Sequence, residues 1–207
     1  MQKLIFISYI LLCSCTIPKN ADIFQKELSE YREKYKKGFL ENTRSPLVAD
    51  EVVFLDFYAA DPTWNLTCTC VKAVNAKSFE MPTYSGVTRT YILHSIATCT
   101  RKNVNFSLNL YKNIHQPINP LYKNNLFLPL KDHTNSEETY GGGRYINLLD
   151  TDIKKNEIVI DFNKSYNPWC AYSDGFNCPV PPQENHLEME VKAGEKNYNG
   201  QYKKSVK

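Results

Sequence analysis

The amino-acid sequence predicts a mainly β protein, with a single antiparallel β-barrel or sandwich-like domain and one N-terminal amphipathic α-helix. From residue 51 onward, apolar residues recur with a period of two, which is typical of half-buried strands. The segments with this period are short and are separated by turns rich in Pro, Gly and Asn. No second long helical pattern follows the first, and this combination favours a barrel or sandwich.

The chain opens with a short apolar run, Leu4–Leu12, which is too short to span a bilayer as a helix of about 20 residues. The run therefore predicts the core of a signal peptide. The sequence Leu12-Cys13-Ser14-Cys15 resembles a bacterial lipobox, in which the cysteine is acylated. We expect a lipoprotein signal peptide over 1–14, a lipid on Cys15 and a tether over 15–20. A simple secretory signal with a chance cysteine is the alternative.

A lipid anchor would hold the protein on a membrane without a spanning helix. The expected location is therefore the cell envelope, with the domain facing the periplasm. Thr16 follows Cys15 where an aspartate is associated with retention in the inner membrane, and this mildly favours the outer membrane.

The length of the mature chain suits one domain with a full core, expected over 21–196. The formal charge is +3, with acidic and basic residues mixed along the chain, so no nucleic-acid footprint is expected. Lysines without acidic neighbours gather near the carboxyl end, which predicts a basic flexible tail over 197–207.

Residues 21–40 are predicted to form the helix, with Asp22 placed to cap its amino end. The apolar stripe consists of Phe24, Leu28, Tyr31, Tyr35 and Phe39. Two acid–base pairs one turn apart are expected, namely Glu30 with Lys34 and Glu33 with Lys37. Gly38 predicts fraying at the carboxyl end. The mixed charge of the polar face favours packing of the stripe on the domain over packing on lipid.

Eight segments are predicted to be strands because of their period-two pattern. They are residues 52–58, 66–74, 87–100, 104–111, 126–131, 144–149, 157–162 and 187–193. The clearest is 104–111, where four apolar residues alternate with Asn and Ser. Residues 100–103 predict a hairpin turn between two of the longer strands.

An oxidising envelope makes disulfides the first expectation for the cysteines. Cys170 and Cys178 enclose a short loop and are predicted to be bonded. Cys68 and Cys70 share one face of a predicted strand, where they cannot comfortably bond each other. One of them is expected to pair with Cys99, leaving one buried thiol. The alternative is that these three thiolates gather a soft metal ion.

Three glycines, 141–143, precede Arg144 at the start of a predicted strand. Backbone N–H groups of such a run can form a concavity that holds an anion, and Arg144 would add donors for a carboxylate or phosphate. The alternative is a tight connection, with Arg144 paired to Asp132 or Asp161.

The stretch DFNKSYNPWCAY, residues 161–172, follows a hydrophobic run and is rich in polar and aromatic residues. Asp and Asn side chains define turns by bonding their own backbone, so the leading interpretation is a polar turn fixed by the following disulfide. If the domain binds a ligand, polar residues at one end of the sheet are expected to converge on it. These residues are Asp132, Tyr140, Arg144, Asp161 and Asn163.

Several segments of the second half, taken in order, resemble the signature of the domain of unknown function 1684 family. They are LFLPLKD (126–132), Thr134, ETYGGGRY (138–145), DFN (161–163), YNP (166–168), CAY (170–172), CP (178–179), PP (181–182), EN (184–185) and AGEK (193–196). The resemblance covers most of the mature chain, with departures at His133, Asn135-Ser136 and His186. It implies relatives in bacteria and archaea that are often lipoproteins or exported and have no established activity.

The sequence thus predicts a membrane-anchored envelope lipoprotein of unknown biochemical activity, acting as a non-catalytic ligand-binding or envelope-assembly module. The expected partners are the membrane, through the lipid, and a small anionic ligand or an envelope protein; no cofactor is expected. The alternative is an envelope hydrolase or metal-dependent enzyme using Asp132 and Asp161 near Arg144. The chain has no HExxH, no GxSxG and no His pair at ligand spacing, so no catalytic residue and no metal site is assigned.

Overall fold

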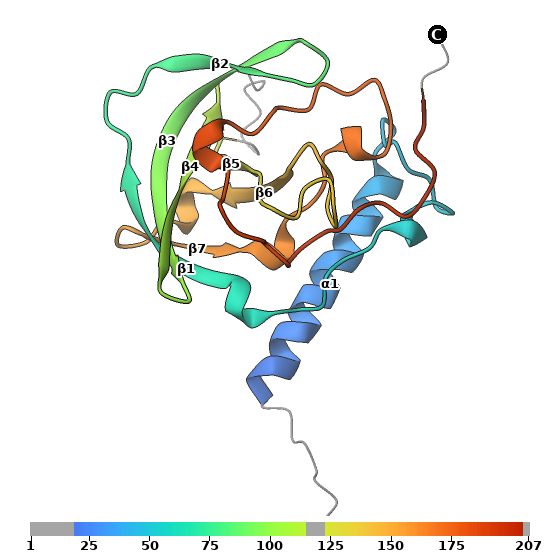
Figure 1. Ribbon diagram of the computed structural model, residues 1–207, viewed down its shortest axis with the longest axis horizontal. Helices are drawn as coiled ribbons and strands as arrows, with labels where there is room; N and C mark the ends of the chain where they lie inside the picture. Colours follow the sequence, from blue (N-terminus) through green and yellow to red (C-terminus); the bar gives the residue numbers. More distant parts are fainter. Residues whose placement is uncertain (1–18, 115–122, 205–207) are drawn as a thin grey trace, which may run out of the picture.

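The computed structural model describes residues 19–114 and 123–204. Helix α1 (Lys19–Glu41) comes first and is followed by one antiparallel sheet. Its strands are β1 (Asn65–Lys72), β2 (Ser78–Pro82), β3 (Thr88–Arg101), β4 (Val104–Asn113), β5 (Asn125–Leu130), β6 (Arg144–Leu149) and β7 (Glu157–Asp161). Their order is β6-β5-β4-β3-β1-β7, with β2 paired to β3. Figure 1 shows the sheet curling around a central core, with α1 on the side opposite β3. The predicted fold class is confirmed.

Six of the eight predicted strands are confirmed, and two are wrong. Residues 52–58 instead begin with a 3₁₀ helix, η1 (Val52–Phe54). Residues 187–193 have the alternating burial of a strand but form none. Leu187 and Met189 bond the backbone of Lys131 and His133, and the carbonyls of Val191 and Ala193 accept hydrogen bonds from the Arg144 side chain. The sheet also contains β2, a short strand that the sequence pattern did not predict; the inward-facing Met81 is its only fully buried residue.

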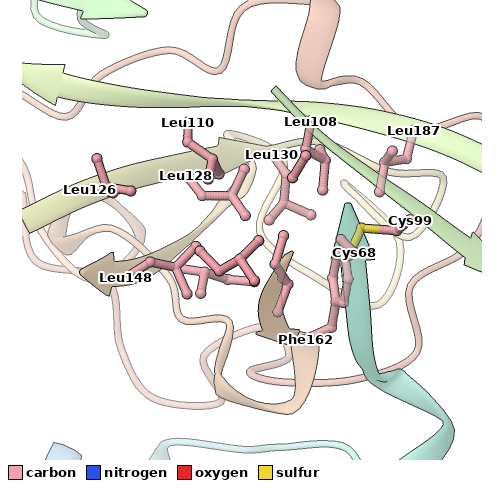
Figure 2. Packing of buried hydrophobic residues seen from close by; sticks show 14 of the residues in the cluster. Cys68, Cys99, Leu108, Leu110, Leu126, Leu128, Leu130, Leu148, Phe162 and Leu187 are labelled. Atoms are coloured by element: carbon pink, nitrogen blue, oxygen red, sulfur yellow. A yellow bond between two sulfur atoms is a disulfide. The ribbon is translucent and has the colours of Figure 1, made fainter. Parts of the chain in front are cut away.

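The core fills the inside of the curled sheet with aliphatic side chains from β4 to β7. Figure 2 shows Leu108 and Leu110 of β4 beside Leu128 and Leu130 of the neighbouring strand β5. The hairpin between β3 and β4 turns at Lys102 (φ 48°) and Asn103 (φ 65°). Two consecutive residues with positive φ are typical of a type I′ turn, which matches the right-handed twist of the strands. The predicted hairpin turn is confirmed.

Two disulfides join the described cysteines. Cys68 of β1 bonds Cys99 of β3 within the core, as Figure 2 shows. Cys170 bonds Cys178, eight residues later. Cys70 is buried and free. The Cys170–Cys178 prediction is confirmed, and so is the pairing of one β1 cysteine with Cys99. Because Cys68 and Cys99 are bonded to each other, three thiolates cannot gather a metal here.

Helix α1 packs on the domain through a buried face that includes Leu28 and Phe39. It continues through Gly38 to Glu41, so the expected fraying at Gly38 is wrong. The ion pairs along the helix also differ from those expected: they are Lys26–Glu30, Lys36–Glu33 and Lys37–Glu41. Among the described residues, no helix combines the length and the apolar character that crossing a membrane requires.

The predicted signal peptide and Cys15 lie outside the described residues. At the other end, residues 197–204 of the segment predicted to be a flexible tail make contacts with the domain. The backbone N–H of Lys203 donates to Tyr172, and the Lys203 ammonium donates to the Pro46 carbonyl. The Tyr198 ring packs edge-to-face on Tyr172.

Candidate functional site

Arg144, predicted to bind a ligand, is completely buried. Its guanidinium donates to Asp132 Oδ2 at 2.8 Å, to the Val191 carbonyl at 2.8 Å, to the Glu195 carbonyl at 3.1 Å and to the Ala193 carbonyl. The Asp132 carboxylate is equally buried. Of the two interpretations of the sequence, the structure therefore has the tight connection, in which Arg144 pairs with Asp132. Neither of the two charges faces solvent.

The glycines before β6 fit the same interpretation. Gly143 has a φ of +87°, and a Cβ there would lie 2.5 Å from the Leu130 carbonyl oxygen. Only glycine fits such a close approach in this conformation. The Tyr140 ring covers Gly142, where a Cβ would lie 2.2 Å from it. The run thus packs closely against neighbouring residues, as a tight connection requires.

Asp161 and Asn163 form a separate group at the end of β7. The Asp161 carboxylate accepts bonds from the backbone N–H of Asn163 at 3.1 Å and from its side-chain amide at 2.9 Å. Asn163 in turn bonds the backbone N–H and C=O of Asp61 at 3.0 and 2.8 Å. This is the predicted polar turn, in η5 (Phe162–Lys164). The five predicted residues therefore do not converge on one ligand.

The sequence analysis missed the most unusual polar group, Glu195, which is completely buried. Its carboxylate accepts bonds from the hydroxyl of Tyr172 at 2.6 Å, the hydroxyl of Tyr35 at 2.9 Å and the backbone N–H of Asn167 at 2.9 Å. Within residues 19–114 and 123–204 no cation pairs with it. Burial raises the pKa of Glu195 to about 7, because the charged form loses its hydration. The site links α1, through Tyr35, to the domain.

The two edge strands of the sheet, β6 and β7, flank a hollow of about 480 Å³, which we call the seam cleft. Its wall includes Tyr31 of α1, which places the helix beside the two edges (Figure 1). Lining residues that can bond a ligand are Tyr31, Asn65, Asn147, Asp152, Lys154, Asp161 and Lys164. Of the five predicted ligand-binding residues, Asp161 lines the seam cleft.

The enzyme alternative requires either a metal site or a pair of cooperating carboxylates. Within the two described ranges, no three His, Cys, Asp or Glu side chains gather closely enough to hold a metal ion. The hydrolase alternative required Asp132 and Asp161 to work together near Arg144. Asp132 bonds Arg144 in the buried interior, whereas Asp161 bonds Asn163 at the end of β7, so the two carboxylates belong to different groups.

We predict that Arg144→Met lowers the free energy of unfolding by about 3–5 kcal/mol, because the Asp132 carboxylate stays buried without its counter-charge. Urea denaturation at pH 7 measures the change. Arg89, an exposed arginine bonded to the Asn177 carbonyl, provides the matched control, and Arg89→Met should change stability by less than about 0.5 kcal/mol. A loss below about 1 kcal/mol for Arg144→Met would contradict the assigned network.

We predict a pH dependence from Glu195, whose pKa is about 7 in the folded protein against an ordinary 4.5. Between these values the unfolded chain releases the proton while the folded protein keeps it, so stability falls as pH rises through this window. The wild type should lose about 3 kcal/mol between pH 4.5 and 8 from this group.

The measurement is urea denaturation at both pH values for the wild type and Glu195→Gln. The glutamine amide can accept from Asn167 and Tyr35 and donate to Tyr172, so the contacts persist without a titrating group. Glu190→Gln, at an exposed residue paired with Lys192, is the control and should titrate like the wild type. An unchanged pH dependence in Glu195→Gln would rule out the assigned protonation.

Comparison with known proteins places this chain among relatives without an established activity. A family model described as "Protein of unknown function (DUF1684)" matches residues 52–196. The chain is similar to the solution NMR structure of an uncharacterized protein from gene locus rrnAC0354 of Haloarcula marismortui, with 29% sequence identity and a TM-score of 0.66. The similarity covers 86% of this chain and 96% of that chain. No curated protein matches the chain. Because the family model spans more than half of its length, the protein belongs to the DUF1684 family.

Proposed function

We propose that the protein is a lipid-anchored lipoprotein of the cell envelope, and that its domain is a non-catalytic module that binds a polar ligand in the seam cleft. The lipobox-like sequence ending at Cys15 supports the anchor. The two disulfides support an oxidising compartment such as the periplasm, because cytosolic proteins rarely keep them. The single observation that carries the binding role is the seam cleft itself.

The charges of the seam cleft favour a ligand that carries both signs. Lys154 and Lys164 contribute two positive charges, and Asp152 and Asp161 contribute two negative charges. Lys164 lies 3.5 Å from Asp161, whereas Lys154 forms no ion pair among the described residues. A balanced set of donors and acceptors suits a zwitterionic molecule better than the purely anionic ligand expected from the sequence.

The position of the cleft favours a ligand from the aqueous phase. Tyr31 lines the cleft and lies twelve residues after Lys19, where α1 begins. At 1.5 Å per residue, this stretch of helix is about 18 Å long. If the lipid on Cys15 holds the amino end at the membrane, the helix can carry the seam cleft away from the lipid headgroups.

The anchor is tested by fractionating cells that express Cys15→Ser. We predict that the wild type is recovered with membranes and that Cys15→Ser is recovered in the soluble fraction, because it cannot be acylated. Cys70→Ala removes a buried thiol instead and should leave the protein with membranes. Mass spectrometry should find the acyl chains on Cys15. A wild type without acylation in the soluble fraction would overturn the anchor.

The seam cleft is tested by ¹⁵N NMR titration of the Cys15→Ser protein with the dipeptide lysyl-aspartate, succinate and putrescine. The charge balance predicts the largest shifts with the dipeptide, at amides lining the cleft such as Asn147 and Val159. Lys154→Glu should weaken binding about threefold or more. Lys102→Glu, in the hairpin turn, is the charge-matched control. Absence of shifts with all three probes, or equal binding by Lys154→Glu, would contradict the proposed cleft.

A further inference from the structure

A second hollow, of about 350 Å³, lies between α1 and Trp169 of η6 (Trp169–Ala171). We call it the aromatic hollow; its lining is Tyr31, Lys34, Tyr35, Gly38, Phe39 and Trp169. The Trp169 ring is held between Phe39, at 6.5 Å between ring centroids, and Phe176, at 5.1 Å. The volume of the aromatic hollow lies in the range of small-molecule sites, which are lined mainly by aromatic and apolar side chains.

Gly38 keeps this hollow open. It lies inside α1, and a Cβ there would meet no atom within 4 Å. A glycine in a helix interior is less stabilising than alanine. Its presence there is normally explained by a positive φ or by the close approach of another chain segment. Neither explanation applies, because Gly38 does not have a positive φ and has space above it. The effect of glycine at this position is to leave room in the aromatic hollow.

Lys34 supplies a charge at the same place. Three other lysines of α1 pair with carboxylates of the helix, namely Lys26 with Glu30, Lys36 with Glu33 and Lys37 with Glu41. Among the residues that the structure describes, Lys34 has no such partner, although the sequence predicted one in Glu30. Its ammonium therefore remains available to an anion beside a set of aromatic rings.

We propose that the aromatic hollow binds a small planar aromatic anion, with its ring against Trp169 and Phe39 and its anionic group at Lys34. Offset or edge-to-face packing of rings favours a flat aromatic ligand. The positive charge at the rim selects an anion over a neutral or cationic analogue. This site is separate from the seam cleft and shares only Tyr31 with it, so failure of either site leaves the other standing.

The test uses 2-naphthoate as the probe and the indole N–H signals of the Cys15→Ser protein as the NMR readout. The chain has two tryptophans, so two indole signals are expected, and Trp169→Phe assigns them. The Trp169 signal should shift with saturation on addition of 2-naphthoate, and the signal of buried Trp64 should not. The neutral analogue 2-naphthamide should bind more weakly. No shift of Trp169 at millimolar 2-naphthoate would overturn the proposal.

Two variants separate the parts of the proposal. Gly38→Leu fills the open space and should abolish the Trp169 shift without lowering the melting temperature. Lys34→Gln should weaken 2-naphthoate about three- to fivefold and leave 2-naphthamide unchanged. Lys37→Gln, on the same helix but outside the hollow, should bind like the parent. Binding that survives Gly38→Leu, or an equal effect of Lys34→Gln on both probes, would contradict the assigned site.

Discussion

The architecture depends on the hydrogen bonds that the buried Arg144 guanidinium makes to the segment 187–195. This segment forms no strand of the sheet and has only scattered backbone bonds, yet its apolar side chains complete the core. Arg144 donates to three of its carbonyls, and Asp132 accepts from the Val191 N–H while neutralising the arginine. A planar guanidinium with five donors can satisfy such a set, which a lysine cannot.

The same segment connects the core to the surface. The Glu195 carboxylate accepts a hydrogen bond from the hydroxyl of Tyr35, and the Glu195 backbone carbonyl accepts one from Arg144. The Arg144 network therefore reaches α1 through Glu195. Tyr35 then packs on Phe39 and faces the aromatic hollow, and Tyr31, one turn earlier, lines both hollows. The position of α1 sets the walls of both candidate sites. Any ligand-binding role would therefore depend on a buried network that touches no ligand.

The sequence could predict what short-range patterns determine. The period-two alternation of apolar residues located six strands. The expected oxidising compartment and the short spacing of the two cysteines predicted the Cys170–Cys178 disulfide. The 187–193 segment was mistaken for a strand because its apolar residues alternate, although its backbone bonds go to scattered partners: Lys131 and His133 for one half, and the Asp132 and Arg144 side chains for the other. Pairing of Arg144 with Asp132 was foreseen only as an alternative to ligand binding.

The polar contacts of Glu195 and Asn163 could not be predicted. Glu195 bonds Tyr35, 160 residues earlier, and Asn163 bonds Asp61, 102 residues earlier. No local pattern marks either pair, because each residue type is common on surfaces and only the fold buries it. Arg144 begins β6 and Asp161 ends β7, and both strand ends lie at the same end of the sheet. The two side chains still belong to different groups, because Arg144 bonds Asp132 in the interior whereas Asp161 bonds Asn163.

We infer that the Arg144 network holds α1 in place through residues 187–195. Hydrogen exchange of Arg144→Lys tests it most directly, because lysine keeps a charge beside Asp132 but cannot bond Asp132 and three carbonyls together. The account predicts faster exchange in 187–195 and in residues 32–40 of α1 together, while β3 and β4 stay protected. Faster exchange in 187–195 with unchanged protection of α1 would contradict it.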